Sequence, residues 1–210
     1  MAAKTYLVVS NGQWPKEEIW RPLVENSVHL IACDGAANQC LAQNISMDTV
    51  IGDMDSLSKE VQTQIQQQPY LQFLHQENQE NNDLVKAINW SVEQGATQIE
   101  VIGIEGGDIS HQFAAILALC EVPSNTRLHT TDSIIQLVNN TRYNNYSIEK
   151  GTSFSLFAIG TVKGVYLTGA KWNLINQELK PGTQGLHNVV EENCLEIKYS
   201  SGRLLLFLDR

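Results

Sequence analysis

The stretch Ile51-Gly52-Asp53-Met54-Asp55-Ser56 completes the apolar run Thr49-Val50-Ile51, which predicts a short buried strand ending at Gly52. If the chain stays extended beyond the glycine, the side chains of Asp53 and Asp55 point to the same face, because side chains alternate along a strand. Two neighbouring carboxylates repel unless a proton or a cation lies between them. Mg²⁺ bound together with substrate phosphates meets that need. The alternative is a polar turn with two solvated aspartates.

Strands that alternate with helices extend this pattern over the first two thirds of the chain. Apolar runs predict strands at residues 5–10, 29–33, 48–51, 71–75, 98–104 and 128–131. Helices are predicted at residues 15–26, 36–43, 58–66 and 83–93, and around residues 109–120. We expect Pro22 to kink or split the first helix, Asn82 to cap the fourth and Gly95 to end it. This alternation predicts a parallel, Rossmann-like sheet with helices on both faces.

Polar residues and glycines gather just after the predicted strands. In parallel α/β sheets, ligands bind beyond the carboxyl ends of the strands. Scattered loop aspartates would have no reason to fall on one edge of a sheet, so this placement predicts a ligand site there. The residues concerned are Asn11, Asp34, Asp53, Asp55 and the pair Gly106-Gly107.

The character of the chain changes near residue 140. Beyond Asn144-Asn145, short apolar or alternating runs at residues 153–159, 164–167, 195–199 and 204–208 are separated by glycine-rich turns, and no helical pattern appears. We therefore expect two domains: an α/β domain at residues 1–140 and a small all-β domain at residues 141–210, a β-sandwich or partial barrel.

Composition narrows the possible partners and the compartment. The chain has 210 residues and a formal charge of −9, and no basic patch predicts a nucleic-acid partner. No apolar run approaches the roughly 20 residues that span a membrane, and no secretory signal is visible. The four cysteines form no metal-binding pattern, and we expect Cys33 and Cys120 to be buried thiols. Together these features predict a cytoplasmic protein.

Several motifs resemble the thiamin pyrophosphokinase family, and the resemblance covers nearly the whole chain. The family's Gly-Asp-x-Asp-Ser motif is matched by Gly52-Asp53-Met54-Asp55-Ser56, and its Asp-Gly-Ala element by Asp34-Gly35-Ala36-Ala37. Its helix motif is matched by Glu80-Asn81-Asn82-Asp83-Leu84-Val85-Lys86-Ala87, with glutamate in place of the first aspartate. Gly169-Ala170-Lys171-Trp172-Asn173-Leu174 and, later, Asn188 are similar to its thiamin-binding segment. The order of these motifs makes the match specific.

The resemblance implies a Mg²⁺-dependent transferase that moves the terminal diphosphate of ATP to the hydroxyl of thiamin, giving thiamin diphosphate and AMP. It also implies a homodimer whose thiamin site lies at the subunit interface, with the α/β domain of one chain facing the β domain of the other. Because the attack falls on the β-phosphorus, such an enzyme must hold two substrates in line and neutralise the polyphosphate charge.

The resemblance also implies roles for residues of the first domain. The expected metal ligands are Asp53, Asp55 and Asp83, which together with Lys86 form the expected catalytic set. Lys86 lies one turn after Asp83 and would bring positive charge to the polyphosphate, or would simply form a surface ion pair. The residues expected to bind ATP are Asp34, Ser56, Gly106, Gly107 and His111. Of these, Asp34 could also cap a helix, and the two glycines could form a plain turn.

In the second domain, the resemblance implies a thiamin site. Trp172 would stack on the thiamin rings through cation–π attraction, or would be a core residue of the β domain. Gln136 lies among apolar residues and needs a polar partner, which is either the ligand or the backbone. His187 stands where the family has serine. The residues expected to bind thiamin are Asp132, Gln136, Trp172, His187 and Asn188.

One element departs from the family. Its Gly-Gly-Arg-x-Asp-His/Gln pattern reads here Gly106-Gly107-Asp108-Ile109-Ser110-His111, and Asp108 cannot pair with a phosphate as arginine does. Two alternatives therefore stay open: a non-catalytic protein that binds thiamin phosphates or a nucleotide, and a pyrophosphokinase acting on another small alcohol. The acidic residues and Lys86 argue against the first, because a binding protein needs no metal triad.

Overall fold

The chain divides into two compact units, residues 1–131 and residues 132–210. The computed structural model describes residues 3–53, 57, 59, 62–63, 67–68, 70–75, 82–123, 125–140 and 144–210. The division lies after Thr131, earlier than the boundary expected at residue 140, because a strand at Ser133–Leu137 pairs with the last strand of the chain.

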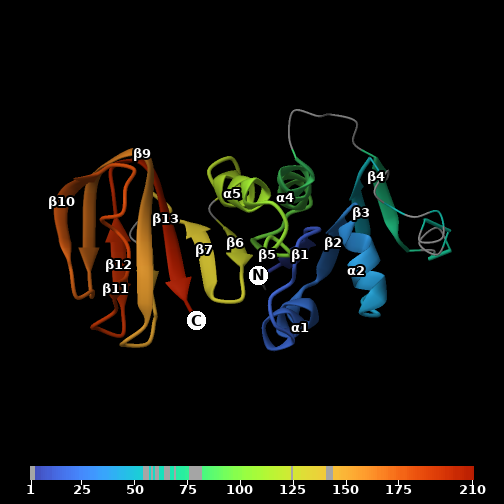
Figure 1. Cartoon of the computed structure of the whole chain (residues 1–210), viewed down its shortest axis with the longest axis horizontal. Helices are drawn as coiled ribbons and strands as arrows, with labels where there is room; N and C mark the ends of the chain where they lie inside the picture. Colours follow the sequence, from blue (N-terminus) through green and yellow to red (C-terminus); the bar gives the residue numbers. More distant parts are fainter. Residues whose placement is uncertain are drawn as a thin grey trace. The chain divides into compact units, whose positions relative to one another are not determined.

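Six parallel strands form the sheet described in the first unit. They are β1 (Thr5–Val9), β2 (His29–Cys33), β3 (Thr49–Gly52), β4 (Gln72–His75), β5 (Gln98–Ile102) and β6 (Thr126–His129). Their order is β4-β3-β2-β1-β5-β6, and every neighbouring pair is parallel (Figure 1). The expected parallel sheet is present, although β5 ends two residues early and β6 begins two residues early.

Helices lie on both faces of this sheet (Figure 1). Helices α1 (Glu17–Asn26) and α2 (Ala36–Ala42) share one hydrophobic core with Leu7 and Val9 of β1. Helix α4 (Asp83–Glu93) packs against β1, β2 and β3, and it also contacts α5 (Ile109–Ala118). Pro22 lies inside α1 without splitting it. Most of the helix expected at 58–66 falls outside the described residues.

The second unit consists of antiparallel strands, and its described residues contain no helix. The strands are β7 (Ser133–Leu137), β8 (Asn144–Tyr146), β9 (Ser153–Thr168), β10 (Leu174–Leu179), β11 (Asn188–Val189), β12 (Leu195–Lys198) and β13 (Ser201–Asp209). The first part of β9 pairs with β13 and β11, and its last part pairs with β10 and β12. Two of the predicted strands are therefore one long strand, while β7, β8, β10 and β11 were not predicted.

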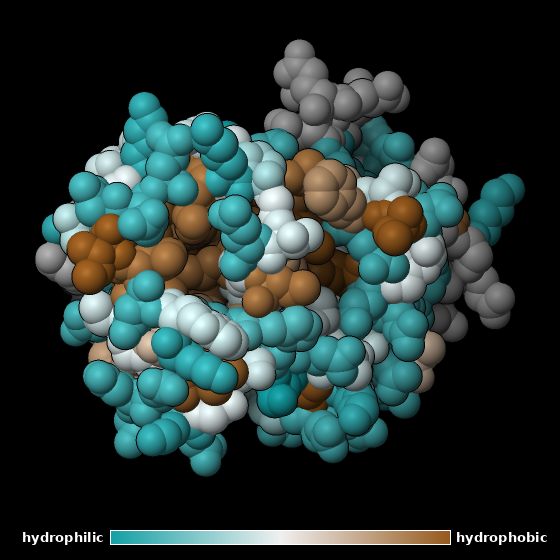
Figure 2. Space-filling view, turned by 60° about the vertical axis from the view of Figure 1, so that its left-hand side comes forward, coloured by the Kyte–Doolittle hydropathy of each residue, from teal (hydrophilic) through white to brown (hydrophobic). Residues whose placement is uncertain are grey.

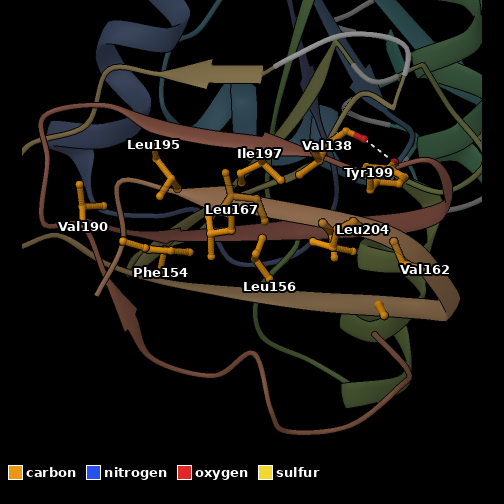
Figure 3. Packing of buried hydrophobic residues seen from close by; sticks show 14 of the residues in the cluster. Val138, Phe154, Leu156, Val162, Leu167, Val190, Leu195, Ile197, Tyr199 and Leu204 are labelled. Atoms are coloured by element: carbon orange, nitrogen blue, oxygen red, sulfur yellow. Dashed lines mark hydrogen bonds between the residues drawn. The ribbon is translucent and has the colours of Figure 1, made fainter. Parts of the chain in front are cut away.

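One hydrophobic core holds the second unit together. Side chains from β9, β12 and β13 point toward one another, as Phe154, Leu167, Ile197 and Leu204 do in Figure 3. Burying such side chains contributes on the order of 25 cal/mol per Å² of apolar surface. Within this cluster, the hydroxyl of Tyr199 donates a hydrogen bond of 2.7 Å to the backbone carbonyl of Val138. A buried hydroxyl is thereby satisfied, as a dry core requires.

The face of the molecule drawn in Figure 2 is mostly hydrophilic, and hydrophobic residues gather in recesses between the hydrophilic ones. No helix in the described residues is long and apolar enough to cross a membrane.

All four cysteines are free thiols. Cys33 and Cys40 are buried and Cys194 is exposed, whereas Cys120 is only half-buried, contrary to the expectation of a buried residue. It follows the last turn of α5, close to the solvent.

Candidate functional site

A candidate site of the first unit lies where the strand order reverses. Strands β2, β3 and β4 extend the sheet on one side of β1, while β5 and β6 extend it on the other. A crevice opens at such a switch point, beyond the carboxyl ends of the strands. There the structure has a cavity of about 600 Å³, bordered by the segments after β1, β2 and β5 and by the first turns of α4 and α5. Residues lining it include Asn11, Asp34, Asp83, Gly106, Gly107 and His111.

Asp34 and the strand end at Gly52 fit closely together. Asp34 is 4% exposed, and its backbone N–H donates to the carbonyl of Ile51 at 2.8 Å. A Cβ atom on Gly52 would lie 2.6 Å from the Cβ of Asp34, which no ordinary side chain tolerates. The glycine of the motif is therefore what lets Asp34 occupy the cavity wall. Asp53 follows as an exposed residue, whereas Asp55 and Ser56 lie outside the described residues.

The first turn of α4 presents an ion pair beside the cavity. The Oδ1 atom of Asn82 accepts a hydrogen bond of 2.9 Å from the N–H of Val85, which confirms the predicted cap. Asp83 begins the helix, where its negative charge is favoured by the helix dipole. The Nζ of Lys86 lies 3.1 Å from the Oδ1 of Asp83, and the side chain of Lys86 is only 10% exposed. A nearly buried ammonium needs such a partner, so this is not a loose surface pair.

The glycine turn after β5 forms the opposite wall. Gly106 and Gly107 both have left-handed backbone angles, with φ of 74° and 66°. The Nε2 of Gln112 braces the turn by donating 3.0 Å to the carbonyl of Gly106. Asp108 caps α5 through its backbone, whose carbonyl accepts from the N–H of His111 at 3.0 Å. His111 thus lies in the first turn of the helix and lines the cavity.

The cavity is acidic. Its described lining residues include Asp34 and Asp83 but no lysine or arginine. Burial first, and then the negative charges of Asp83 and Asp34, raise the pKa of the Cys33 thiol, while Lys86 opposes this rise. The pKa of the Cys33 thiol therefore depends on both carboxylates and on the ammonium group of Lys86. No group of three or more histidine, cysteine or acidic residues that could hold a metal occurs among the residues that the structure describes.

Gln39 lines this cavity but was not predicted from the sequence. Gln39 of α2 donates from its Nε2 to the backbone carbonyls of Asn11 and Gly12, both at 3.2 Å. This amide fixes the loop after β1, which borders the cavity. A glutamine within a helix carries no sequence signal for such a role, because the partner loop lies 27 and 28 residues earlier in the chain.

The second unit has a cavity of about 450 Å³ with a largely apolar lining. Trp172 lines it and is 55% exposed, so Trp172 is not the core tryptophan that was the alternative interpretation. Asn188 holds the backbone of Trp172 by accepting from its N–H at 3.2 Å and donating to its carbonyl at 2.8 Å. The Nζ of Lys171 lies 4.6 Å from the centre of the indole ring. Exposed Leu186 and Ile175 complete an apolar rim.

The other three residues expected to bind thiamin do not line this cavity. His187 has a left-handed φ of 57°, and its N–H donates to the Oγ of Ser155 at 3.1 Å. Gln136 is half-buried on β7, opposite Leu206 of β13. The carbonyl of Asp132 accepts from the backbone N–H of the C-terminal residue at 3.0 Å. The structure thus brings together Trp172 and Asn188 only.

Comparisons with known proteins match both units. A model of the catalytic domain of thiamin pyrophosphokinase matches residues 20–131, and a model of the vitamin B1 binding domain of thiamin pyrophosphokinase matches residues 139–204. The chain belongs to the thiamin pyrophosphokinase family. It is an enzyme of the thiamin pyrophosphokinase type.

Solved thiamin pyrophosphokinase structures share the fold. The chain resembles the enzyme of Bacillus subtilis with 20% identity and a TM-score of 0.82, covering 98% of this chain and 99% of that one. It resembles the Geobacillus thermodenitrificans protein with 21% identity and a TM-score of 0.82, covering 98% and 97%. It resembles the yeast enzyme with 17% identity and a TM-score of 0.80, covering 100% and 87%. A search of curated protein sequences found no match.

The two thiamin pyrophosphokinase matches correspond to the two structural units. The catalytic-domain match ends at residue 131, the last residue of the first unit, and it includes Asp34, Asp83 and Lys86. The vitamin B1 binding match includes Trp172 and Asn188, which together border the apolar cavity.

Proposed function

We propose that this enzyme transfers the terminal diphosphate of ATP to the hydroxyl of thiamin, giving thiamin diphosphate and AMP, with Mg²⁺ as cofactor. Family membership supports the reaction class. The observation in the structure that carries the proposal is the acidic cavity at the switch point of the sheet, where Asp34, the Asp83–Lys86 pair and the Gly106–Gly107 turn come together.

The acidic lining fits a magnesium–nucleotide complex better than a free nucleotide. A polyphosphate at this cavity meets Asp34 and Asp83 but no lysine or arginine among the described lining residues, so its charge needs a bound cation. Carboxylate oxygens are the protein ligands that Mg²⁺ prefers. We propose Asp53, Asp55 and Asp83 as its ligands. When bound, the ion would supply charge neutralisation at the phosphate oxygens.

The residues of the chain would bind and align the two substrates. Lys86, held by Asp83 at 3.1 Å, would place a positive charge close to the polyphosphate. The backbone N–H groups of the Gly106–Gly107 turn would approach the phosphates. Asp34, Ser56 and His111 would contact other parts of the nucleotide. Such alignment of donor and acceptor accounts for much of the barrier reduction in phosphoryl transfer.

In the second unit, the exposed indole of Trp172 would stack on the thiamin rings, because the cationic thiazolium is attracted to an aromatic face. Asn188 would act by holding the backbone of Trp172 in place. Asp132, Gln136 and His187 are proposed to contribute polar contacts to thiamin. We also propose that a Rossmann-like first unit and a β-sandwich second unit act in a cytoplasmic homodimer, with the second copy completing the site.

The test is to incubate the protein with ATP, Mg²⁺ and thiamin and to measure AMP and thiamin diphosphate by chromatography. We expect equimolar products, none with EDTA, and a loss of about a hundredfold or more in Lys86→Met, because a cation at the transferred group is removed. Lys4→Met, which removes an exposed lysine just before the start of β1, at the opposite end of that strand from the cavity segment, is the matched control.

Other outcomes would favour the alternatives. If thiamin binds but no AMP forms, the protein is a binding member of the family. If AMP forms only when a different small alcohol replaces thiamin, the acceptor assignment is wrong. Asp55→Asn is expected to abolish turnover with little loss of folding, and unchanged turnover in that variant contradicts the metal assignment.

A further inference from the structure

Glu105 connects two parts of the first unit that are far apart in sequence. It lies between β5 and the Gly106–Gly107 turn, and its Oε2 atom accepts two hydrogen bonds from Thr131. The backbone N–H of Thr131 donates at 2.7 Å and its hydroxyl donates at 3.1 Å. Thr131 is the last residue of the first unit. The carboxylate therefore ties the end of that unit to the glycine turn of the cavity.

The backbone of Glu105 is fixed as well. Its carbonyl accepts from the N–H of Gln13 at 2.5 Å, and the two residues form an isolated antiparallel bridge. Gln13 lines the cavity in the loop after β1. The backbone of Glu105 is thus bonded to one wall of the cavity, the loop after β1. The next two residues, Gly106 and Gly107, form another wall. A shift of the turn would move the carboxylate and with it Thr131.

The choice of a carboxylate at this position needs an explanation. A negative charge beside a cavity proposed for a polyphosphate is unfavourable. Hydrogen bonds to an ionised acceptor are roughly twice as strong as those between neutral groups. A carboxylate that accepts two donors from Thr131 therefore gives a firmer connection than an amide or a hydroxyl would. These two hydrogen bonds indicate that Glu105 serves to hold Thr131 in place rather than to contact the nucleotide.

We propose that Glu105 is a positioning residue that couples nucleotide binding at the Gly106–Gly107 turn to thiamin binding at Asp132. The inference rests on the proposed function, which assigns ATP to the turn and thiamin to Asp132. Only one peptide bond separates Thr131 from Asp132. A nucleotide that binds the glycine turn restrains Glu105 and Thr131 further, and so restricts the backbone that carries Asp132. Coupling of this kind acts equally in both directions.

The experiment measures thiamin binding by calorimetry with and without saturating Mg²⁺ and α,β-methylene ATP, in which a methylene bridge that resists cleavage replaces the oxygen between the α and β phosphorus atoms. We expect the nucleotide to tighten thiamin binding to the wild type about tenfold, within the usual range of such coupling. Glu105→Ala should reduce this factor to about one. Thr131→Val, which keeps the N–H donor and loses the hydroxyl, should retain about threefold coupling. Glu121→Ala, which removes an exposed carboxylate, should behave as the wild type.

A merely structural role would lower the unfolding temperature of Glu105→Ala and leave the coupling factor unchanged, and that result would overturn the inference. Equal coupling in all four proteins, or none in the wild type, would do the same. If Glu105→Ala does not fold, Glu105→Gln and Thr131→Val decide: both must show weaker coupling than the wild type. A wild type that turns over thiamin while Glu105→Ala keeps full coupling refutes this inference alone. A wild type that does not bind thiamin refutes the proposed function and this inference together.

Discussion

Replacing Gly52 by alanine tests the contact that shapes the cavity wall. A Cβ atom at this position would lie 2.6 Å from the Cβ and 3.3 Å from the Cγ of Asp34. Carbon atoms in contact are normally about 3.5–4.0 Å apart, so the backbone segments that carry Gly52 and Asp34 would have to separate by roughly 1 Å. Asp34 cannot yield easily, because it is buried and its N–H is bonded to the carbonyl of Ile51.

The expected loss of stability has two parts. Forcing an extra carbon into a packed site typically costs about 1–3 kcal/mol. The φ of Gly52 is 154°, and a side chain at such a strained backbone angle adds about 1 kcal/mol or more. We therefore expect Gly52→Ala to lower the free energy of unfolding by about 3 kcal/mol. For a unit of this size, that corresponds to a decrease in Tm of roughly 10 °C.

Two other glycines separate these contributions in the same thermal unfolding assay. Gly95 has a left-handed φ of 84° but nothing within 4 Å of its Cβ position, so Gly95→Ala carries backbone strain alone, about 1 kcal/mol. Gly182 has no left-handed φ and only a distant neighbour at 3.9 Å, so Gly182→Ala should be neutral within about 1 kcal/mol. Turnover should fall in Gly52→Ala even well below its Tm, because Asp34 is displaced.

A Tm for Gly52→Ala within about 2 °C of the wild type would refute the reasoning. So would a Tm no lower than that of Gly95→Ala, because the close approach to Asp34 would then cost nothing beyond strain.

Four further predictions concern a helix cap, the burial of two thiols and two titrating groups. Asn82→Ala should lower the unfolding free energy by about 1 kcal/mol, while Asn82→Asp, which can still accept the capping bond, should change it little in thermal unfolding. Iodoacetamide at pH 8 should alkylate Cys194 in the folded protein, but Cys33 and Cys40 only after unfolding; early modification of the latter two, read by mass spectrometry, would contradict their burial. Burial raises the pKa of Cys40 from 9.0 to about 12, so its contribution to stability is complete below pH 9.0 and is lost as pH rises through 12. Burial lowers the pKa of His29 below 6.5, so its contribution is present above pH 6.5 and is lost as pH falls; His29→Gln should flatten the stability profile between pH 7 and 5, and an unchanged profile would argue against this.

The order of strands and helices in the first unit was largely readable from local patterns. Apolar runs, the Asn82 cap and the stop at Gly95 depend on residues a few positions apart, and these signals survive in the fold. The placement of Asn11, Asp34 and the Gly106–Gly107 turn on one cavity was also predictable. It follows from a general property of parallel sheets, whose strands all end at the same edge.

The second unit was less predictable, because its strand partners lie far apart in the chain. β7 pairs with β13 about seventy residues later, and no local pattern announces that pairing. The exposure of Trp172 was likewise undecided, since an aromatic residue in a β domain suits a core as well as a binding site.

By itself, the sequence determined that an α/β unit precedes an all-β unit, and it led to the prediction that Asp53, Asp55 and the Asp83–Lys86 helix start serve phosphate chemistry. Only the tertiary structure decided that Gly52 makes room for Asp34, that Lys86 is nearly buried against Asp83, and that Glu105 holds Thr131. The physical reason is that propensity and periodicity act between near neighbours in the chain. Each of the first and third contacts instead joins residues eighteen or more positions apart, and the burial of Lys86 depends on packing of the whole sheet.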